Sequence, residues 1–457
     1  MAEFHDTTGQ PGPAMWEVGN YPQSQDDLPV TGVSWYEAAA YAEFAGKSLP
    51  TIYHWAVAAG IPAGSFILPL SNFGTSAPAP VGHYQGLGPF GTYDMAGNVK
   101  EWCWNQNGKE QEKRYILGGA FNEPFYMFHD PDAQPAFNRL STYGFRCVKY
   151  LSPLPVSQVL LNPVAWPSRD FSSEKPVSDE AFRIFQRFYS YDKTDLDPVV
   201  ESVDNSSPDY RKEKISFRAA YGNERMTAYV FLPRKVAPPY QTVIYFPGST
   251  ALRTRSSETL VTISSLEPGI GALGFLLQSG RAVVYPVYKS TYERGDALAS
   301  DRPNTTALYR DHVVQWYKDF ARTVDYLETC SDVDTDKLAY FGTSWGAVMG
   351  AIIPALENRL KVSILVVGGF FQQQTLPEVD QLNFAPRVKI PALMLNGRYD
   401  FVFPVETSQQ PMFRLLGTTP KDKQHILFDT GHSIPRNEMI KWTLDWLDRY
   451  LGAVKRS

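Results

Sequence analysis

Residues 339–350 read AYFGTSWGAVMG: an apolar segment, a short turn and then a run of small residues. The turn Gly342-Thr-Ser344-Trp-Gly346 has the Gly-x-Ser-x-Gly pattern of a nucleophile elbow, in which a sharp strand-to-helix turn lifts a serine hydroxyl above a sheet. Glycine fits the two outer positions because a side chain there would clash with neighbouring atoms. We therefore predict that Ser344 is a nucleophile. A buried serine at a helix start is the alternative interpretation.

Apolar segments of strand length alternate with helix-like segments on both sides of this turn. We expect helices near residues 178–189, 308–329 and 435–451. Strands are expected near residues 213–218, 227–232, 242–246, 282–287, 337–341, 362–367, 391–395 and 425–428. Such alternation indicates a mostly parallel sheet covered by helices on both faces. The predicted fold class of residues 177–457 is therefore a doubly wound α/β domain.

An aspartate and a histidine follow late strands, giving the order Ser, Asp, His along the chain. His432 comes after the segment ILFDTG at 426–431, and we predict that it takes the proton of the serine as a general base. Asp400 ends the segment PALMLNGRYD at 391–400, and we predict that its carboxylate orients the imidazole of His432.

Three other residues compete for these roles. Asp429 is the alternative acid, but it lies three residues before His432 and is too near in sequence to reach the far nitrogen of the ring easily. His425 opens its strand at the opposite end, and His312 falls within a predicted helix. We expect both of these histidines to be structural.

Acyl transfer also needs backbone N–H groups directed at the developing oxyanion, each worth about 3 kcal/mol. Trp345, directly after the predicted nucleophile, is expected to supply one of them. The second is expected from the segment Pro247-Gly248-Ser249 after the apolar residues 243–246, and we assign it to Ser249 rather than Gly248.

Aromatic residues make up 14% of the chain, and several follow the central strands. Their rings suit pockets that hold apolar or aromatic groups. We predict a pocket for an apolar or aromatic acyl group that is lined by Tyr288, Tyr292, Phe370 and Phe371, with Tyr285, Trp345 and Phe403 as further candidates.

The composition argues against several classes of partner. The net charge is −5 and no basic block is present, so nucleic acid is not expected. No run of about 18 apolar residues exists, so no membrane span is expected, and the first residues contain no apolar signal core. We therefore predict a cytoplasmic protein with a small-molecule partner. The composition gives no indication of the oligomeric state.

The three cysteines do not form a recognisable disulfide scaffold or zinc site by number and spacing. We expect Cys103 and Cys147 to be buried free thiols, with a bridge between them as the alternative. Cys330 stands alone in the second half of the chain.

A length of 457 residues suggests two domains. We separate residues 1–27, which are polar and rich in proline and glycine, as an N-terminal tail. Residues 28–150 form a loop-rich domain, in which the helix expected from Ser34 to Ala45 starts with a capping box. Residues 151–176 contain five prolines and are predicted to be a linker.

The two halves resemble two known families. Residues 178–454 resemble the α/β-hydrolase superfamily. Residues 28–150 resemble the formylglycine-generating-enzyme (sulfatase-modifying factor) family, which has a C-type-lectin-like fold. Five blocks carry the second resemblance: PVTGVSWYEA (29–38), GKSLPT (46–51), YDMAGNVKEW (93–102), LGG (117–119) and GFRC (144–147). The combination is similar to the C-terminal portion of certain bacterial serine/threonine kinases, which implies that this chain is either a fragment or a short relative.

Active members of the formylglycine family hold copper with two cysteines that follow the Gly-Gly block. No cysteine lies between Gly119 and Phe145 in this chain, so the soft thiolate site is absent and oxidase activity is not expected. His54, His83 and His129 lack the spacing of a ligand set on one helix.

The same resemblance implies a place for a structural calcium ion in the N-terminal domain, near Asn98 and Glu101. Capping of turns by these two side chains is the alternative.

These patterns together favour a carboxylic ester hydrolase that works through an acyl-serine intermediate and requires no metal or organic cofactor. A peptidase or amidase that resembles the prolyl-oligopeptidase-type enzymes is the second hypothesis. A non-catalytic interaction protein is the third, and the Ser, Asp and His set argues against it.

Overall fold

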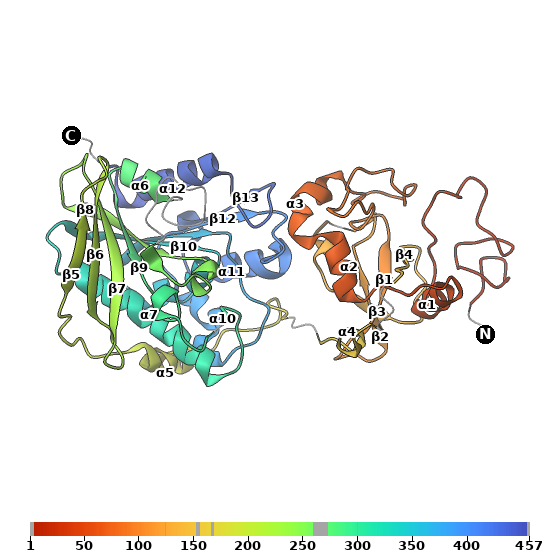
Figure 1. Ribbon diagram of the computed structural model, residues 1–457, viewed down its shortest axis with the longest axis horizontal. Coiled ribbons are helices and arrows are strands. Elements are labelled where there is room, and N and C mark those ends of the chain that lie inside the picture. The colour runs from red at the N-terminus through yellow and green to blue at the C-terminus, as the bar shows by residue number, and fades with distance from the viewer. Residues whose placement is uncertain are drawn as a thin grey trace. The chain divides into compact units, whose positions relative to one another are not determined.

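The computed structural model describes residues 4–123, 125–151, 156–165, 169–258, 273–298 and 300–454. The chain forms two compact units, Met1–Pro167 with Tyr399–Pro404 and Ser168–Arg398 with Val405–Ser457 (Figure 1). Residues 1–3 of the predicted tail and residues 152–155 and 166–168 of the predicted linker lie outside the described residues.

The second unit is built on one large sheet. Its strands are β5 (Val199–Asp204), β6 (Tyr210–Arg218), β7 (Arg225–Pro233), β8 (Tyr240–Phe246), β9 (Ala282–Pro286), β10 (Val333–Thr343), β11 (Leu360–Val366), β12 (Ala392–Gly397) and β13 (Lys423–Phe428). In the described part of this unit the nine strands follow the order β13-β12-β11-β10-β8-β9-β7-β6-β5. Neighbours from β13 to β9 are parallel, and β7, β6 and β5 are antiparallel to their neighbours. The prediction of a mostly parallel α/β sheet is confirmed.

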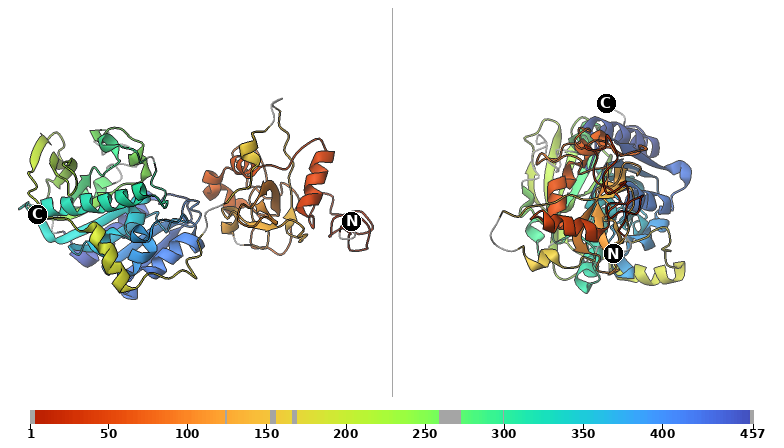
Figure 2. Two further views of the ribbon diagram at one scale, coloured as in Figure 1. Left: turned by 90° about the horizontal axis from the view of Figure 1, so that it is seen from below. Right: turned by 90° about the vertical axis from the view of Figure 1, so that its right-hand side faces the viewer.

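Helices cover both faces of this sheet. The core on one face includes side chains of α5 (Asp179–Tyr189), α7 (Ala307–Leu327), α10 (Gln381–Phe384) and α11 (Gln410–Leu415). The core on the other face includes side chains of α6 (Gly274–Gln278) and α12 (Arg436–Leu451). Figure 1 shows α6 and α12 on one side of the sheet and α5 and α7 on the other, and the left view of Figure 2 shows α7 along its length.

Strand β10 lies at the centre of the sheet, between β8 and β11. Phe341 pairs with Tyr245 of β8 and with Ile364 of β11. The side chains of residues 338–341 are buried, because helices cover both faces of the sheet at this point. The strand leads directly into α8 (Trp345–Met349) and then α9 (Ile353–Leu356), so the sharp turn between β10 and α8 stands at the carboxyl edge of the parallel strands.

Among the described strands of this sheet, only β5 is not predicted from the sequence. It lies at the edge, pairs only with β6 and exposes nearly all of its side chains. An edge strand of this kind buries too little apolar surface to leave a hydrophobic pattern in the sequence.

The first unit combines a small sheet with short helices and many turns. Its helices are α1 (Trp35–Phe44), α2 (Ile52–Ala59), α3 (Gly64–Ile67) and α4 (Gln158–Leu161). Its strands β1 (Lys100–Gln106), β2 (Lys113–Leu117), β3 (Ala133–Pro135) and β4 (Tyr143–Gly144) follow the order β3-β2-β1-β4. Helix α1 starts with the predicted capping box, in which Ser34 and Glu37 bond reciprocally to each other's backbone N–H groups.

Buried tryptophans and one buried cation organise this unit. Trp55 and Trp102 are almost completely buried, and their indole N–H groups donate to Glu101 and to the carbonyl of Val33. Lys100 is buried as well and forms ion pairs with Glu123 and Asp132 at 2.7 and 2.6 Å.

Residues 4–27, which the sequence analysis separates as a tail, are hydrogen-bonded to the first unit. The guanidinium group of Arg139 donates to the carbonyl oxygens of His5 and Gly12. The N–H of Ala14 donates to the carbonyl of Gly32 at 2.8 Å.

Candidate active site

Ser344 occupies the turn between β10 and α8 in a strained conformation. Its φ of +54° and ψ of −110° fall in a region that residues with a side chain rarely adopt. Its N–H donates to the carbonyl of Val366 at 2.8 Å, which anchors the turn to β11.

The two glycines of the elbow are required by the close approach of backbone atoms. A Cβ atom on Gly342 would clash with the carbonyl group of Gly346, and a Cβ on Gly346 would clash with the carbonyl group of Phe246. Any side chain at these positions would therefore push α8 away from the end of β8 or β10. The strand-turn-helix context that the sequence predicts for Ser344 is present.

Ser344 and His432 lie in direct contact although 88 positions separate them in the sequence. The Oγ atom of Ser344 is 2.9 Å from Nε2 of His432, which is hydrogen-bond distance. His432 belongs to the loop between β13 and α12 and is partly exposed. The arrangement allows the imidazole to take the hydroxyl proton as the oxygen attacks a substrate.

Asp400 lies in the loop after β12 and is almost fully buried, with 1% exposure. Its Oδ1 atom accepts hydrogen bonds from the N–H groups of Val402 at 2.8 Å and Phe403 at 3.1 Å. These two bonds fix the orientation of the carboxylate in its loop.

The loops that follow β12 and β13 are packed closely at their bases. A Cβ atom on Gly397 would clash with the carbonyl oxygens of Thr430 and Gly431, just before His432. The N–H of Arg398 also donates to the carbonyl of Phe428 at 2.8 Å. These contacts bring the segment just before Asp400 to the segment that carries His432.

Asp429, the alternative acid, points to solvent. Its side chain is 74% exposed, and Oδ1 accepts a hydrogen bond from Nε of Arg398 at 2.8 Å. The two other histidines of the second unit have structural surroundings. His425 packs on Phe413, and burial lowers its pKa to about 4. His312 is hydrogen-bonded to the carbonyl of Leu308 and to Asp296.

The predicted oxyanion donors lie on both sides of the elbow. Trp345 is the first residue of α8, and the first N–H groups of a helix have no partner within the helix. Ser249 begins a short 3-10 helix, Ser249–Leu252. A Cβ atom on Gly248 would lie 3.6 Å from Cβ of Ser344, and the N–H of Gly346 donates to the carbonyl of Pro247 at 3.0 Å. Gly248 is therefore beside the serine and Ser249 follows it in the chain, so the choice of Ser249 stays a prediction.

Most of the aromatic residues predicted to line the substrate pocket are core residues. The ring of Tyr288 is fully buried against Phe246 at 4.1 Å, and its hydroxyl donates to the carbonyl of Tyr245. Tyr285 and Tyr292 are joined by a hydroxyl–hydroxyl hydrogen bond of 2.6 Å. Phe370, Phe371, Phe403 and Trp345 are each exposed by 3% or less. Large rings at the ends of central strands are as useful for filling the core as for contacting a substrate, so burial corrects the prediction of an open aromatic pocket.

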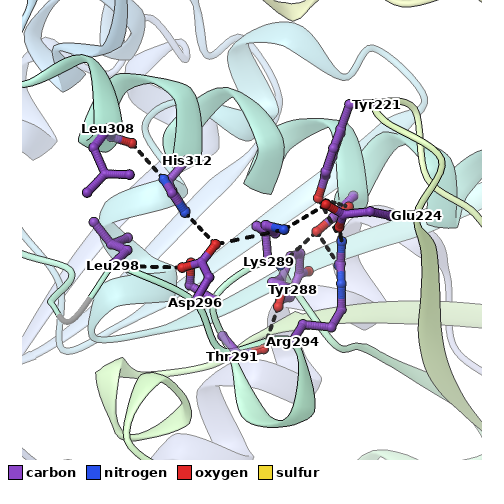
Figure 3. A network of polar contacts seen from close by, with 12 residues as sticks. Tyr221, Glu224, Tyr288, Lys289, Thr291, Arg294, Asp296, Leu298, Leu308 and His312 are labelled. Atoms are coloured by element: carbon purple, nitrogen blue, oxygen red, sulfur yellow. Dashed lines mark hydrogen bonds and ion pairs between the residues drawn. The ribbon is translucent and has the colours of Figure 1, made fainter.

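A network of charged residues that the sequence analysis does not single out fixes the loop after β9 (Figure 3). Asp319 of α7 is completely buried and accepts hydrogen bonds from Arg294 at 2.6 Å, from the N–H of Lys289 and from the hydroxyl of Tyr221. Burial raises the pKa of Asp319, and the neighbouring Arg294 opposes this rise. Glu224 pairs with both Lys289 and Arg294.

The same network continues to His312 on α7. Nε2 of His312 is 2.9 Å from Oδ2 of Asp296, and Oδ1 of Asp296 accepts from Ser290 and from the N–H of Leu298. Removing one partner of a buried ion pair leaves a charge without compensation, at a cost of about 3–5 kcal/mol. The loop from residue 288 to 298 is therefore held by charge pairs on both sides. The sequence contains one indication of this network. Several charged residues follow directly after an apolar strand in the segment YKSTYERGD at 288–296.

The residues that the sequence suggests as possible metal ligands lie in the first unit. The side-chain amide of Asn98 bonds to Asn72 and Ala79, and the carboxylate of Glu101 bonds to Arg146 and Trp55. Both side chains thus hold turns and strands together, and calcium binding stays a prediction. Burial lowers the pKa of His129 to about 4. Over the described part of the chain, no group of three or more His, Cys, Asp or Glu residues is arranged to hold a metal ion.

The thiols of this unit are unbridged, as expected, but the expected burial holds for Cys103 and not for Cys147. Cys103 is buried and Cys147 is partly exposed, as is Cys330 of the second unit. In the residues that the structure covers, no helix is both long enough and apolar enough to cross a membrane.

Comparison with known proteins identifies the class of each unit. Residues 4–151 match the family described as sulfatase-modifying factor enzyme 1-like domain, and residues 283–443 match the family described as serine hydrolase (FSH1). The second match contains Ser344, Asp400 and His432. The protein therefore carries a sulfatase-modifying-factor-like domain followed by a serine hydrolase domain of α/β-hydrolase fold, as the sequence resemblances imply.

Individual relatives match parts of the chain. The serine/threonine-protein kinase pkn1 of Chlamydia pneumoniae is 35% identical over 153 residues, which cover 27% of this chain and 24% of the kinase. The formylglycine-generating enzyme of Thermomonospora curvata is 35% identical over 118 residues, covering 20% of this chain and 39% of that enzyme. The chain thus spans well under half the length of either relative.

Among solved structures, acetyl xylan esterase 1 from Thermoanaerobacterium sp. JW/SL YS485 is similar with 14% identity and a TM-score of 0.46. The similarity covers 61% of this chain and 96% of that esterase.

The packing of the elbow gives a stability prediction. The variant Gly346→Ala is expected to lower the free energy of unfolding of the second unit by about 3 kcal/mol, because the added methyl group meets the carbonyl of Phe246 at the centre of the sheet. The matched control is Gly248→Ala, whose Cβ would make only an ordinary contact of 3.6 Å at a φ of −76°, and its effect should stay within about 1 kcal/mol. Urea unfolding of both variants measures the difference, and equal stabilities would contradict the packing argument.

Proposed function

We propose that the second unit hydrolyses carboxylic esters through an acyl-serine intermediate. The contact between Oγ of Ser344 and Nε2 of His432 is the observation that carries the proposal. As Oγ attacks the ester carbonyl, the imidazole accepts the hydroxyl proton, and the negative charge that forms on the carbonyl oxygen is met by backbone N–H groups.

The reaction then proceeds in two halves. The tetrahedral intermediate collapses when the C–O bond to the alcohol breaks, and the imidazolium returns its proton to the leaving oxygen. Water next attacks the acyl-serine, with His432 accepting a proton from it, and the acid product leaves with Ser344 restored. These steps use only groups of the protein, so the proposed reaction requires no metal or organic cofactor.

We assign the orientation of the imidazole to Asp400. This assignment is supported by its burial, by the two N–H groups that fix its carboxylate, and by the close packing of the segments before Asp400 and before His432. Asp429 is engaged by Arg398 at the surface, which makes it the weaker candidate.

Peptide or amide hydrolysis is the second candidate function, since the same three side chains can perform it. Enzymes of the prolyl-oligopeptidase type usually carry a β-propeller beside the hydrolase. The first unit here has a small four-stranded sheet with short helices instead, in the residues described. We therefore favour esters as the substrate class.

The nucleophile assignment is tested by Ser344→Ala. Turnover of 4-nitrophenyl acetate and butyrate is expected to fall by about four to six powers of ten, because without the hydroxyl no acyl-enzyme can form. His432→Ala should behave in the same way, and circular dichroism should show both variants folded. A folded Ser344→Ala variant that keeps near wild-type ester cleavage would refute the assignment. Faster cleavage of an aminoacyl 4-nitroanilide than of the esters would favour the peptidase alternative.

The identity of the acid is tested by a matched pair of variants. Asp400→Asn is expected to lower kcat by about 10⁴-fold, because an amide at this place favours the wrong tautomer of His432. Asp429→Asn should change kcat by less than about threefold, since it removes an exposed ion pair. The reverse order of effects would show that Asp429 is the acid.

A further inference from the structure

The first unit contains a large cavity whose lining lies wholly within residues 4–147. Its volume is about 1060 Å³, and most of the lining is apolar or aromatic, including Trp16, Val33 and Phe145. Sites that hold small organic ligands in proteins are typically clefts of about 300–1,000 Å³ with a mainly apolar lining and a few polar groups. The cavity thus has the size and the lining of a ligand site.

Apolar side chains at the rim of this cavity are exposed to solvent. The side chains that line the cavity and are between 41% and 64% exposed are those of Val30, Tyr41, Val81 and Tyr93. The ring of Tyr41 packs edge-on against Phe145, with the ring centroids 5.6 Å apart. Covering exposed apolar surface is favourable by about 25 cal/mol per Å². The rim therefore favours an occupant with an apolar or aromatic body.

Two ion pairs hold the walls of the cavity in place. Arg139 pairs with Glu37 of α1 at 2.8 Å and also donates to the carbonyl of Gly12, which ties the N-terminal segment to the helix. Arg146 pairs with Glu101 of β1 at 2.6 Å. Glu37, Gly12, Glu101 and Arg146 all line the cavity. The walls are therefore formed before a ligand arrives, so binding loses little conformational entropy.

Asp94 also lines the cavity, and its carboxylate differs from the two that are paired with arginines. Its Oδ2 atom accepts a hydrogen bond from the N–H of Gly82 at 2.7 Å. Within the described part of the chain, no ion pair of 4.0 Å or less joins Asp94 to a cation. Burial raises the pKa of Asp94, and the N–H of Gly82 and the charges of Arg146 and His83 act in the opposite direction. A cation that enters the cavity would stabilise the charged carboxylate.

We propose that this cavity binds a small aromatic molecule that carries a protonated amine. The ammonium group pairs with Asp94, and the aromatic body covers the exposed rim around Tyr41. Charge complementarity selects a cation, because the carboxylates of Glu37 and Glu101 already have guanidinium partners. Aromatic rings such as that of Tyr93, next to Asp94 in the chain, also attract a cation to their faces. The site lies in the first unit and does not depend on the proposed ester hydrolysis.

The test compares three dansylamides that differ only at the end of one alkyl chain. Dansylcadaverine ends in an amine, N-hexyl dansylamide ends in a methyl group, and N-dansyl-6-aminohexanoic acid ends in a carboxylate. Dansyl fluorescence titration with the full chain gives the Kd of each compound. We expect the amine to bind about tenfold more tightly than the hexyl compound, which is the size of effect of one charge-assisted hydrogen bond. The carboxylate should bind more weakly than either of the others.

Two pairs of variants locate the charge and the apolar contact. Asp94→Asn, which suits the φ of +55° at this position, should raise the Kd of dansylcadaverine about tenfold and leave that of the hexyl compound within about twofold. Its control is Glu43→Gln, an exposed carboxylate outside the lining, which should change neither Kd by more than about twofold. Tyr41→Ala should raise both Kd values about fivefold because an aromatic contact is lost. Phe44→Ala is its control, since Phe44 is 88% exposed on the same helix but does not line the cavity.

Cys147 gives an independent readout of where the ligand binds. Its thiol lines the cavity, whereas Cys330 belongs to the second unit. Dansylcadaverine at about ten times its Kd leaves roughly a tenth of the sites free by mass action. Alkylation of Cys147 by iodoacetamide, followed by peptide mapping with mass spectrometry, should therefore slow at least about fivefold, while alkylation of Cys330 stays unchanged.

The proposal is refuted if the amine and the hexyl compound bind equally, if the carboxylate binds best, or if Cys147 is not protected. A dimer in analytical ultracentrifugation that Tyr41→Ala dissociates would assign the cavity to a second copy of the chain and refute the proposal as well. Should Asp94→Asn not fold, the three Kd values of the wild-type protein and the protection of Cys147 decide in its place. Binding should be unchanged in Ser344→Ala, so the failure of this proposal and that of the esterase proposal are distinguishable.

Discussion

The close approach of backbone atoms around Ser344 is the constraint on which the rest of the catalytic unit depends. The peptide groups of Phe246, Gly342 and Gly346 leave no room for a side chain at either glycine. This packing keeps α8 tight against the ends of β8 and β10, and it maintains the positive φ of Ser344 against its conformational cost of about 1–3 kcal/mol. The strands on both sides supply the rigidity, because β10 is buried at the centre of a parallel sheet.

The sheet then explains why residues so distant in sequence meet. The carboxyl ends of parallel strands share one edge, so the loops after β10, β12 and β13 emerge on the same side. Ser344 and His432 are in contact there, and the absence of a side chain at Gly397 lets the loop after β12 pack on the backbone before His432. The charged network around Asp319 adds a second support, since it fixes the loop from residue 288 to 298 after β9.

Much of this organisation is readable in the sequence, for physical reasons that differ from element to element. The central strands are continuous apolar segments, so they are predicted well. The elbow can be recognised in the sequence because glycine is required at two fixed positions. Strand β5 is not predicted from the sequence, since its side chains are exposed and its position depends on pairing with β6. The prediction for the aromatic residues is wrong because large apolar rings suit both a substrate pocket and a core. Tyr288 and Phe370 are buried in the core, and only the packing of the folded chain shows this. Charge pairs such as Arg294 with Asp319 join residues 25 positions apart on different elements, which no local pattern reveals.

The central claim is that Ser344 is the reactive nucleophile of the second unit, activated by His432. The most direct measurement is peptide mapping by mass spectrometry after reaction of the full chain with a fluorophosphonate, which phosphonylates activated serines. We expect one adduct on the peptide that contains Ser344, and we expect its formation to be strongly slowed in His432→Ala, because the hydroxyl then has no base. An adduct on another serine, or equal labelling of Ser344 with and without the histidine, would contradict the account.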